Sequence, residues 1–165
     1  MKQQSTPFNV AIITQDKAWI PKLKKNKYPQ VNQSAQFNLV PPEHAKAPIP
    51  ADAVWVMEDQ HEAALDTTTA AHTVLEQFTR EGKPVVFFGL GDTNRLEDAF
   101  GNPNNETIPI KEDPRFETVA SFIKFDGNQE IATIGRHVIP ANEDWDYRVR
   151  GALELTWDAR KGSRR

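Results

Sequence analysis

Residues 83–101, which read KPVVFFGLGDTNRLEDAFG, decide the fold. Residues 84–88 form a short run of β-branched and aromatic residues, which is typical of a strand buried on both faces of a sheet. Gly89-Leu90-Gly91 predicts a tight turn after it, because glycine tolerates the backbone angles that such turns need. Asp92 or Thr93 can then cap an amphipathic helix. This order of strand, turn and helix is the repeating unit of an α/β domain.

Similar apolar runs precede this unit at residues 9–14, 37–40 and 53–57. The first of them, NVAIIT, has no polar alternation, as expected for a strand inside a parallel sheet. We expect a helix over residues 16–27, and a second one that is capped by Asp66 or by one of Thr67 to Thr69 and stops at Gly82. Strands that alternate with helices in this way predict an α/β fold with a doubly wound, mostly parallel, flavodoxin-like sheet.

The alternation of strands and helices changes after residue 111. Residues 107–110 predict a short fifth strand, and Asp126-Gly127-Asn128 predicts a hairpin turn between residues 119–125 and 130–134. A last helix is indicated by apolar residues four apart, which would dock on the domain itself or on a partner: Trp145, Val149, Leu153 and Trp157. We therefore expect one domain over residues 1–165, with core α/β repeats in 1–111 and a C-terminal hairpin and helix in 112–165.

Composition excludes several classes of function. The chain has 165 residues and no cysteine, so it has no disulfides, thiolate zinc sites or cysteine nucleophiles. A net charge of −3 gives no general attraction to nucleic acid, which we do not expect as a partner. No apolar run approaches the length of a membrane span. These features predict a cytoplasmic protein without membrane insertion.

Ligands of open α/β sheets bind beyond the carboxyl ends of the strands. In this chain the rule selects residues 14–16, 58–62, 89–94 and 111–113. The turn after residue 88 could bring backbone N–H groups to a phosphate or nucleotide, although an ordinary tight turn explains the same residues. The predicted ligand-binding residues are Gly89, Gly91, Asp92, Thr93, Asn94 and Lys111.

A second candidate is a magnesium site built from carboxylates, which are the ligands that hard divalent cations prefer. It would consist of Asp16, Glu58 and Asp59, and His61 would broaden the choice of metal. The alternative is a solvated polar loop after a buried strand. No serine lies in a GxSxG motif, and we assign no catalytic residue.

With the strands placed, residues 8–125 resemble a response-regulator receiver domain, with departures at each reactive position. Receiver domains have two acidic residues after the first strand, whereas this chain has only Asp16 there. Met57 stands at the position of the phospho-accepting aspartate. Gly89 takes the place of a Thr or Ser, and Lys111 is followed by Glu112 instead of proline. The resemblance implies a degenerate receiver that is not phosphorylated. Such a domain would act in signalling by docking a protein partner or a second copy of itself, or by binding a ligand.

Residues 83–101 are also similar to the nucleophile region of class I glutamine amidotransferase-like domains, with Gly89 where their cysteine stands. This likeness implies a relative without the nucleophile. We expect a non-catalytic regulatory or protein-interaction domain of degenerate receiver type. The alternative is a protein or enzyme that binds a small nucleotide-like or phosphorylated ligand at the carboxyl ends of the strands.

Overall fold

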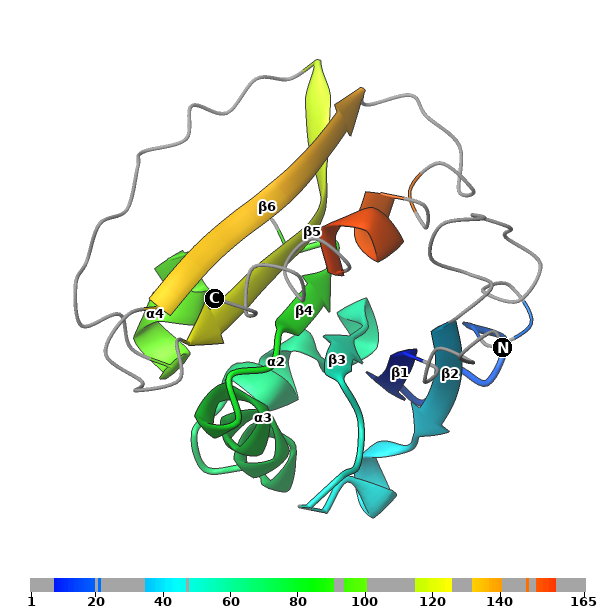
Figure 1. Ribbon diagram of the computed structural model, residues 1–165, viewed down its shortest axis with the longest axis vertical. Coiled ribbons are helices and arrows are strands. Elements are labelled where there is room, and N and C mark those ends of the chain that lie inside the picture. Colours follow the sequence, from blue (N-terminus) through cyan, green and yellow to red (C-terminus); the bar gives the residue numbers. More distant parts are fainter. Residues whose placement is uncertain are drawn as a thin grey trace, which may run out of the picture.

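The computed structural model describes residues 8–19, 21, 35–46, 48–90, 94–100, 115–125, 132–140, 148 and 151–156. Within these ranges the chain forms a six-stranded sheet in the order β2-β1-β3-β4-β5-β6 (Figure 1). The strands are β1 (Phe8–Ile13), β2 (Ala35–Val40), β3 (Ala53–Val56), β4 (Val85–Phe88), β5 (Phe116–Phe125) and β6 (Ala132–Pro140).

One half of the sheet is parallel. Strands β2, β1, β3 and β4 all run in the same direction, with Val10 opposite Phe37 and Ala53, and Val54 opposite Val85. Every residue of β3 and of β4 is buried, which explains why these segments are continuous apolar runs without polar alternation. The α/β class expected from the sequence is confirmed.

The other half is antiparallel, so the sheet is mixed and not a parallel sheet throughout. Strand β5 pairs antiparallel with β4, and β6 pairs antiparallel with β5. The antiparallel strand pair predicted near the C-terminus is therefore confirmed and lies beside β4, while the predicted turn Asp126-Gly127-Asn128 lies outside the described residues. The segment predicted as that strand, residues 107–110, lies outside the described residues.

Helices cover both faces of the sheet (Figure 1). On one face lie α2 (His61–Leu65), α3 (Ala70–Arg80) and α4 (Asn94–Phe100), and on the other lies the helical segment 151–156. Alternate residues of each strand enter two separate cores. In β3, for example, Val54 and Val56 face the core under α3, whereas Trp55 faces the core that contains Ala152 and Leu153.

Helix α3 begins after one of the four predicted N-cap candidates and ends before the predicted stop at Gly82. Thr69 is its N-cap, and its side chain accepts a hydrogen bond from the backbone N–H of His72 at 3.1 Å. Gly82 follows the helix with a positive φ of 70°, which favours glycine. The helix buries Val74, Leu75 and Phe78 against the sheet.

The segment 151–156 docks on its own domain. Ala152 and Leu153 are fully buried, and the buried Trp55 Nε1–H donates a hydrogen bond of 2.9 Å to Thr156 Oγ1. Trp145 and Trp157, the aromatic ends of the predicted last helix, lie outside the described residues. In the part of the chain that is described, no helix has the length and hydropathy to cross a membrane.

Candidate functional site

The carboxyl ends of β1, β3 and β4 meet at one edge of the sheet, as the parallel pairing requires. After β3 the chain enters a short 3-10 helix, η2 (Glu58–Gln60), and then α2. Two backbone hydrogen bonds fix this connection: Met57 N–H donates to Ile13 O at 3.2 Å, and Gln60 N–H donates to Met57 O at 2.9 Å. Residues 58–62 are thereby held beside the end of β1 and the turn that follows β4.

The Asp59 carboxylate joins η2 to the end of β1. Its Oδ1 accepts a hydrogen bond from the Thr14 hydroxyl at 2.8 Å, and its Oδ2 accepts one from the Gln15 N–H at 2.9 Å. Gln60 Nε2 also donates to Oδ2, at 3.2 Å. Partial burial alone would raise the pKa of Asp59, but these hydrogen bonds outweigh it and hold the pKa below its ordinary value.

These contacts bear on the predicted magnesium site of Asp16, Glu58 and Asp59. Both oxygens of Asp59 are used in binding the end of β1, and Asp16 Oδ1 accepts a hydrogen bond from the Ala18 N–H in its own turn. Among the residues with described positions, no group of three or more His, Asp or Glu side chains could hold a metal ion. Metal binding by these carboxylates stays a prediction.

Gly89 forms the turn after β4, and its backbone has a positive φ of 85°. A Cβ atom at this position would stand 2.7 Å from Glu58 Oε1, which is too close for any side chain unless Glu58 moves. The Gly89 N–H donates to Val119 O at 2.6 Å, at the point where a bulge shifts the β5–β6 register between Thr118 and Ala120. Glycine at 89 thus lets the Glu58 side chain lie directly against the backbone of the turn.

The Ser121 hydroxyl supports the same turn from β5. Ser121 is fully buried, and its hydroxyl donates to the backbone carbonyl of Leu90. Since that hydrogen is committed to the backbone, Ser121 stabilises the turn and is not placed as a nucleophile.

His61 lies behind this turn as the first residue of α2. Its side chain is only 9% exposed, and its ring packs on Phe87 with 5.5 Å between centroids. The Nε2 atom is buried and has no hydrogen-bond partner among the described atoms. Burial lowers the pKa of His61, while the Glu58 carboxylate and the carbonyls of Val56 and Phe88 oppose that shift. The ring is therefore neutral at physiological pH.

Arg95 of α4 reaches the same edge. Its guanidinium forms an ion pair of 2.8 Å with Glu62 Oε1 of α2; Glu62 is exposed, whereas Arg95 is half-buried. The Arg95 charge also acts on His61 and favours the neutral imidazole. One edge of the sheet thus carries a buried imidazole, a guanidinium and two exposed carboxylates, those of Glu58 and Glu62.

The structure brings some of the predicted site residues together and leaves others apart. Gly89, Glu58 and Asp59 come together at this edge, whereas Asp16 stays in the loop after β1. Asn94 is the first residue of α4, and its side chain is not described. Gly91, Asp92, Thr93 and Lys111 lie outside the described residues.

Sequence reasoning did not assign Arg95, and it considered His61 only as an additional ligand of a metal ion. The signal for His61 was its place just after a buried strand, at the edge where ligands of α/β sheets bind. Arg95 had no such signal, because a basic residue in the first turn of a surface helix is ordinary.

Comparisons with known proteins give no match: no family model, no curated protein and no solved structure is significantly similar to this chain. A function must therefore be argued from the site itself.

Proposed function

We propose that the chain is a binding domain, without covalent chemistry of its own, that takes a small polar ligand at the carboxyl ends of β3 and β4. The observation that carries the proposal is the buried His61 Nε2, which has no partner among the described atoms. An unpaired buried polar group costs about 1–3 kcal/mol, so such groups are uncommon unless a ligand or water completes them. His61 also lies at the edge where α/β sheets bind ligands.

We expect a ligand to reach His61 past Glu58. The Glu58 side chain is exposed, lies against Gly89 and acts electrostatically on the imidazole. Because it is flexible and open to solvent, it can move aside for a ligand at little cost. Arg95 and Glu62 then offer a donor and an acceptor next to the imidazole. This combination suits a ligand with both donors and acceptors, such as a nucleoside or nucleotide.

A binding role fits the site better than catalysis. Position 89 carries no side chain, so the turn that presents a reactive group in the resembled amidotransferase-like domains presents none here. The Ser121 hydroxyl, which lies nearest to this turn from β5, is committed to Leu90 O. The polar groups can orient a ligand but supply no nucleophile.

The test is a thermal-shift screen of the intact chain against nucleosides, nucleotides and inorganic phosphate. A ligand at 100 times its Kd should stabilise the protein by about 2.7 kcal/mol, which is readily seen. We expect His61→Gln to remove the shift and His44→Gln, a change of the same type at an exposed position, to retain it. No shift with any member of the panel, or an equal shift in His61→Gln, would refute the proposal.

A second candidate is the regulatory domain of degenerate receiver type, acting in the cytoplasm by docking a protein partner or a second copy. It is favoured by the order β2-β1-β3-β4 of the parallel strands, which matches the first four strands of flavodoxin-like sheets. Met57 at the acceptor position is fully buried. Incubation with acetyl phosphate and magnesium should leave the intact mass unchanged, whereas a gain of one phosphoryl group would contradict this candidate. Sedimentation would show whether the chain dimerises.

A further inference from the structure

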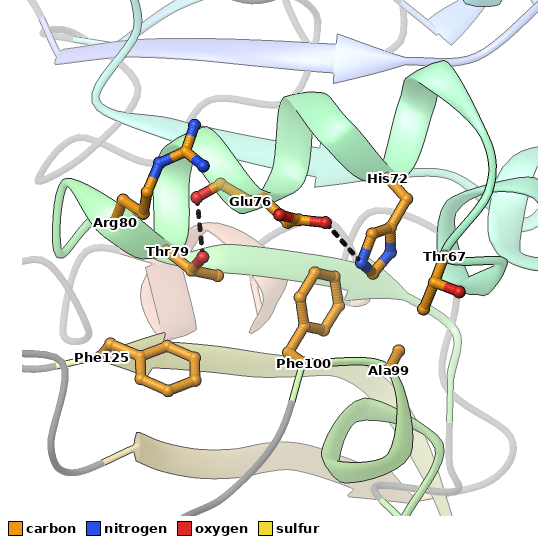
Figure 2. A pocket seen from close by; sticks show the side chains of 8 residues that line it. All are labelled: Thr67, His72, Glu76, Thr79, Arg80, Ala99, Phe100 and Phe125. Atoms are coloured by element: carbon orange, nitrogen blue, oxygen red, sulfur yellow. Dashed lines mark hydrogen bonds and ion pairs between the residues drawn. The ribbon is translucent and has the colours of Figure 1, made fainter.

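A groove of about 360 Å³ lies between α3, α4 and the end of β5, apart from the site proposed above (Figure 2). Such a volume is at the lower end of the range for small-molecule sites. The lining residues are Thr67, His72, Glu76, Thr79, Arg80, Ala99, Phe100 and Phe125. Figure 2 shows the rings of Phe100 and Phe125 on the side of the groove opposite α3.

The aromatic side of the groove is preorganised. Phe100 stacks on the His72 ring, with 4.7 Å between centroids and 15° between planes, and its other neighbour is Phe87 at 6.4 Å. Phe125 is only 8% exposed at the far end of β5. These packing contacts fix the two phenyl rings. The protein would therefore lose little conformational entropy when an aromatic ligand binds between them.

The polar side of the groove offers acceptors. His72 Nδ1 lies 2.8 Å from Ala64 O, and because a carbonyl only accepts, this nitrogen carries the proton and donates it there. The Thr79 hydroxyl donates to Glu76 O at 2.8 Å, so its hydrogen is also committed. The groove also presents the Thr67 hydroxyl, the Arg80 side chain and the Glu76 carboxylate. The Glu76 side chain is 46% exposed, and its Oε1 lies 3.3 Å from His72 Nε2.

From this complementarity we propose that the groove binds an aromatic ring that carries a positively charged nitrogen, that is, a small aromatic amine. The ammonium group would donate to the Glu76 carboxylate, and the ring would pack against Phe100 and Phe125, whose π faces attract a nearby cation. Arg80 lies one helical turn beyond Glu76 at the end of α3. Its charge disfavours an ammonium at that end and so orients the nitrogen toward Glu76.

The test is a titration of the ¹⁵N-labelled intact chain, followed by ¹H–¹⁵N NMR, with phenethylamine and with phenylacetate. The two probes share a ring and differ in charge. We expect phenethylamine to give saturable shifts in α3 and α4, and phenylacetate to bind at least about tenfold more weakly, since a charged hydrogen bond contributes that much. Equal affinity for the two probes, or no saturable shift with phenethylamine, would overturn the proposal.

Variants then locate the site. Glu76→Gln keeps the size of the side chain and removes its charge, and we expect it to weaken phenethylamine binding about tenfold. Glu154→Gln makes the same change at an exposed position of the segment 151–156, on the other face of the sheet, and should leave the affinity unchanged. Unchanged binding in Glu76→Gln would show that the amine binds elsewhere and would contradict the assignment. The outcome does not depend on the His61 site, because that site is tested with other ligands and another variant.

Discussion

Glu58 Oε1 lies 2.7 Å from the point where a Cβ atom would stand on Gly89. The same glycine has a φ of 85°, a backbone conformation in which any side chain is strained. We expect Gly89→Ala to destabilise the fold by roughly 1–2 kcal/mol through the backbone, with little more from the contact, because the exposed Glu58 side chain can move aside. Urea unfolding followed by circular dichroism would measure the loss.

A matched glycine separates the two effects. Gly82 also has a positive φ, of 70°, but an added Cβ would meet only Phe125 O at 3.4 Å, an ordinary contact. Gly82→Ala should therefore show the backbone cost by itself. Gly89→Ala should cost about as much as Gly82→Ala, and adding Glu58→Ala to it should recover little stability. A much larger cost for Gly89→Ala that Glu58→Ala recovers would show that Glu58 is held over the turn and does not move aside.

The Thr14–Asp59 hydrogen bond should act as a latch between the ends of β1 and β3. In a double-mutant cycle with Thr14→Val and Asp59→Asn, we expect a coupling free energy of about 1 kcal/mol, since the carboxylate is mostly exposed and solvent screens it. Additive effects of the two changes would mean that the latch contributes nothing.

The stabilisation by the Thr14–Asp59 hydrogen bond should also depend on pH. Because the pKa of Asp59 is lower in the folded protein than in the unfolded chain, the carboxylate stabilises the fold above its ordinary pKa of about 3.9. That contribution should disappear as the pH falls through the folded value. As the pH is lowered, the free energy of unfolding should therefore fall less steeply in Asp59→Asn than in the wild type. An equal fall in the two proteins would contradict the prediction.

Local patterns in the sequence predicted the parallel part of the fold. The apolar runs at residues 9–14, 53–57 and 84–88 correspond to β1, β3 and β4, because strands buried on both faces leave no room for polar alternation. The hairpin could also be predicted, but not that it pairs antiparallel with β4. That pairing depends on long-range contacts, such as the Gly89 N–H with Val119 O, which no local pattern encodes.

The site was only partly visible in the sequence for a similar reason. The rule that ligands bind at the carboxyl ends of strands correctly selected Glu58, Asp59 and Gly89 as neighbours. It could not show that the Asp59 oxygens are committed to the end of β1, nor that His61 is buried with an unpaired nitrogen. Roles of this kind depend on side-chain geometry between elements that are distant in sequence.

Besides the buried Ala152 and Leu153, one buried hydrogen bond holds the segment 151–156 on the domain, from Trp55 Nε1–H to Thr156 Oγ1. Thr156→Val keeps the shape of the side chain but leaves the indole N–H without its partner. We expect a loss of about 1–3 kcal/mol in the free energy of unfolding. Glu154→Gln, on the exposed side of the same segment, should have little effect. A stability of Thr156→Val equal to that of the control would show that the segment does not dock as described.

His61 should make the stability of the protein fall as the pH is lowered below neutral. Burial holds its folded pKa below the ordinary histidine value of about 6.5, so the unfolded chain binds a proton at a higher pH than the folded protein does. The unfolded state is therefore favoured as the pH falls through 6.5, by up to about 1.4 kcal/mol for each unit of pKa difference. In denaturant unfolding from about pH 8 to about pH 5.5, the wild type should lose more stability than His61→Gln, whereas exposed His44→Gln should follow the wild type. If His61→Gln keeps the full pH dependence, His61 takes up its proton as easily in the folded protein as in the unfolded chain. The imidazole would then be solvated, and it would offer a ligand no unpaired nitrogen.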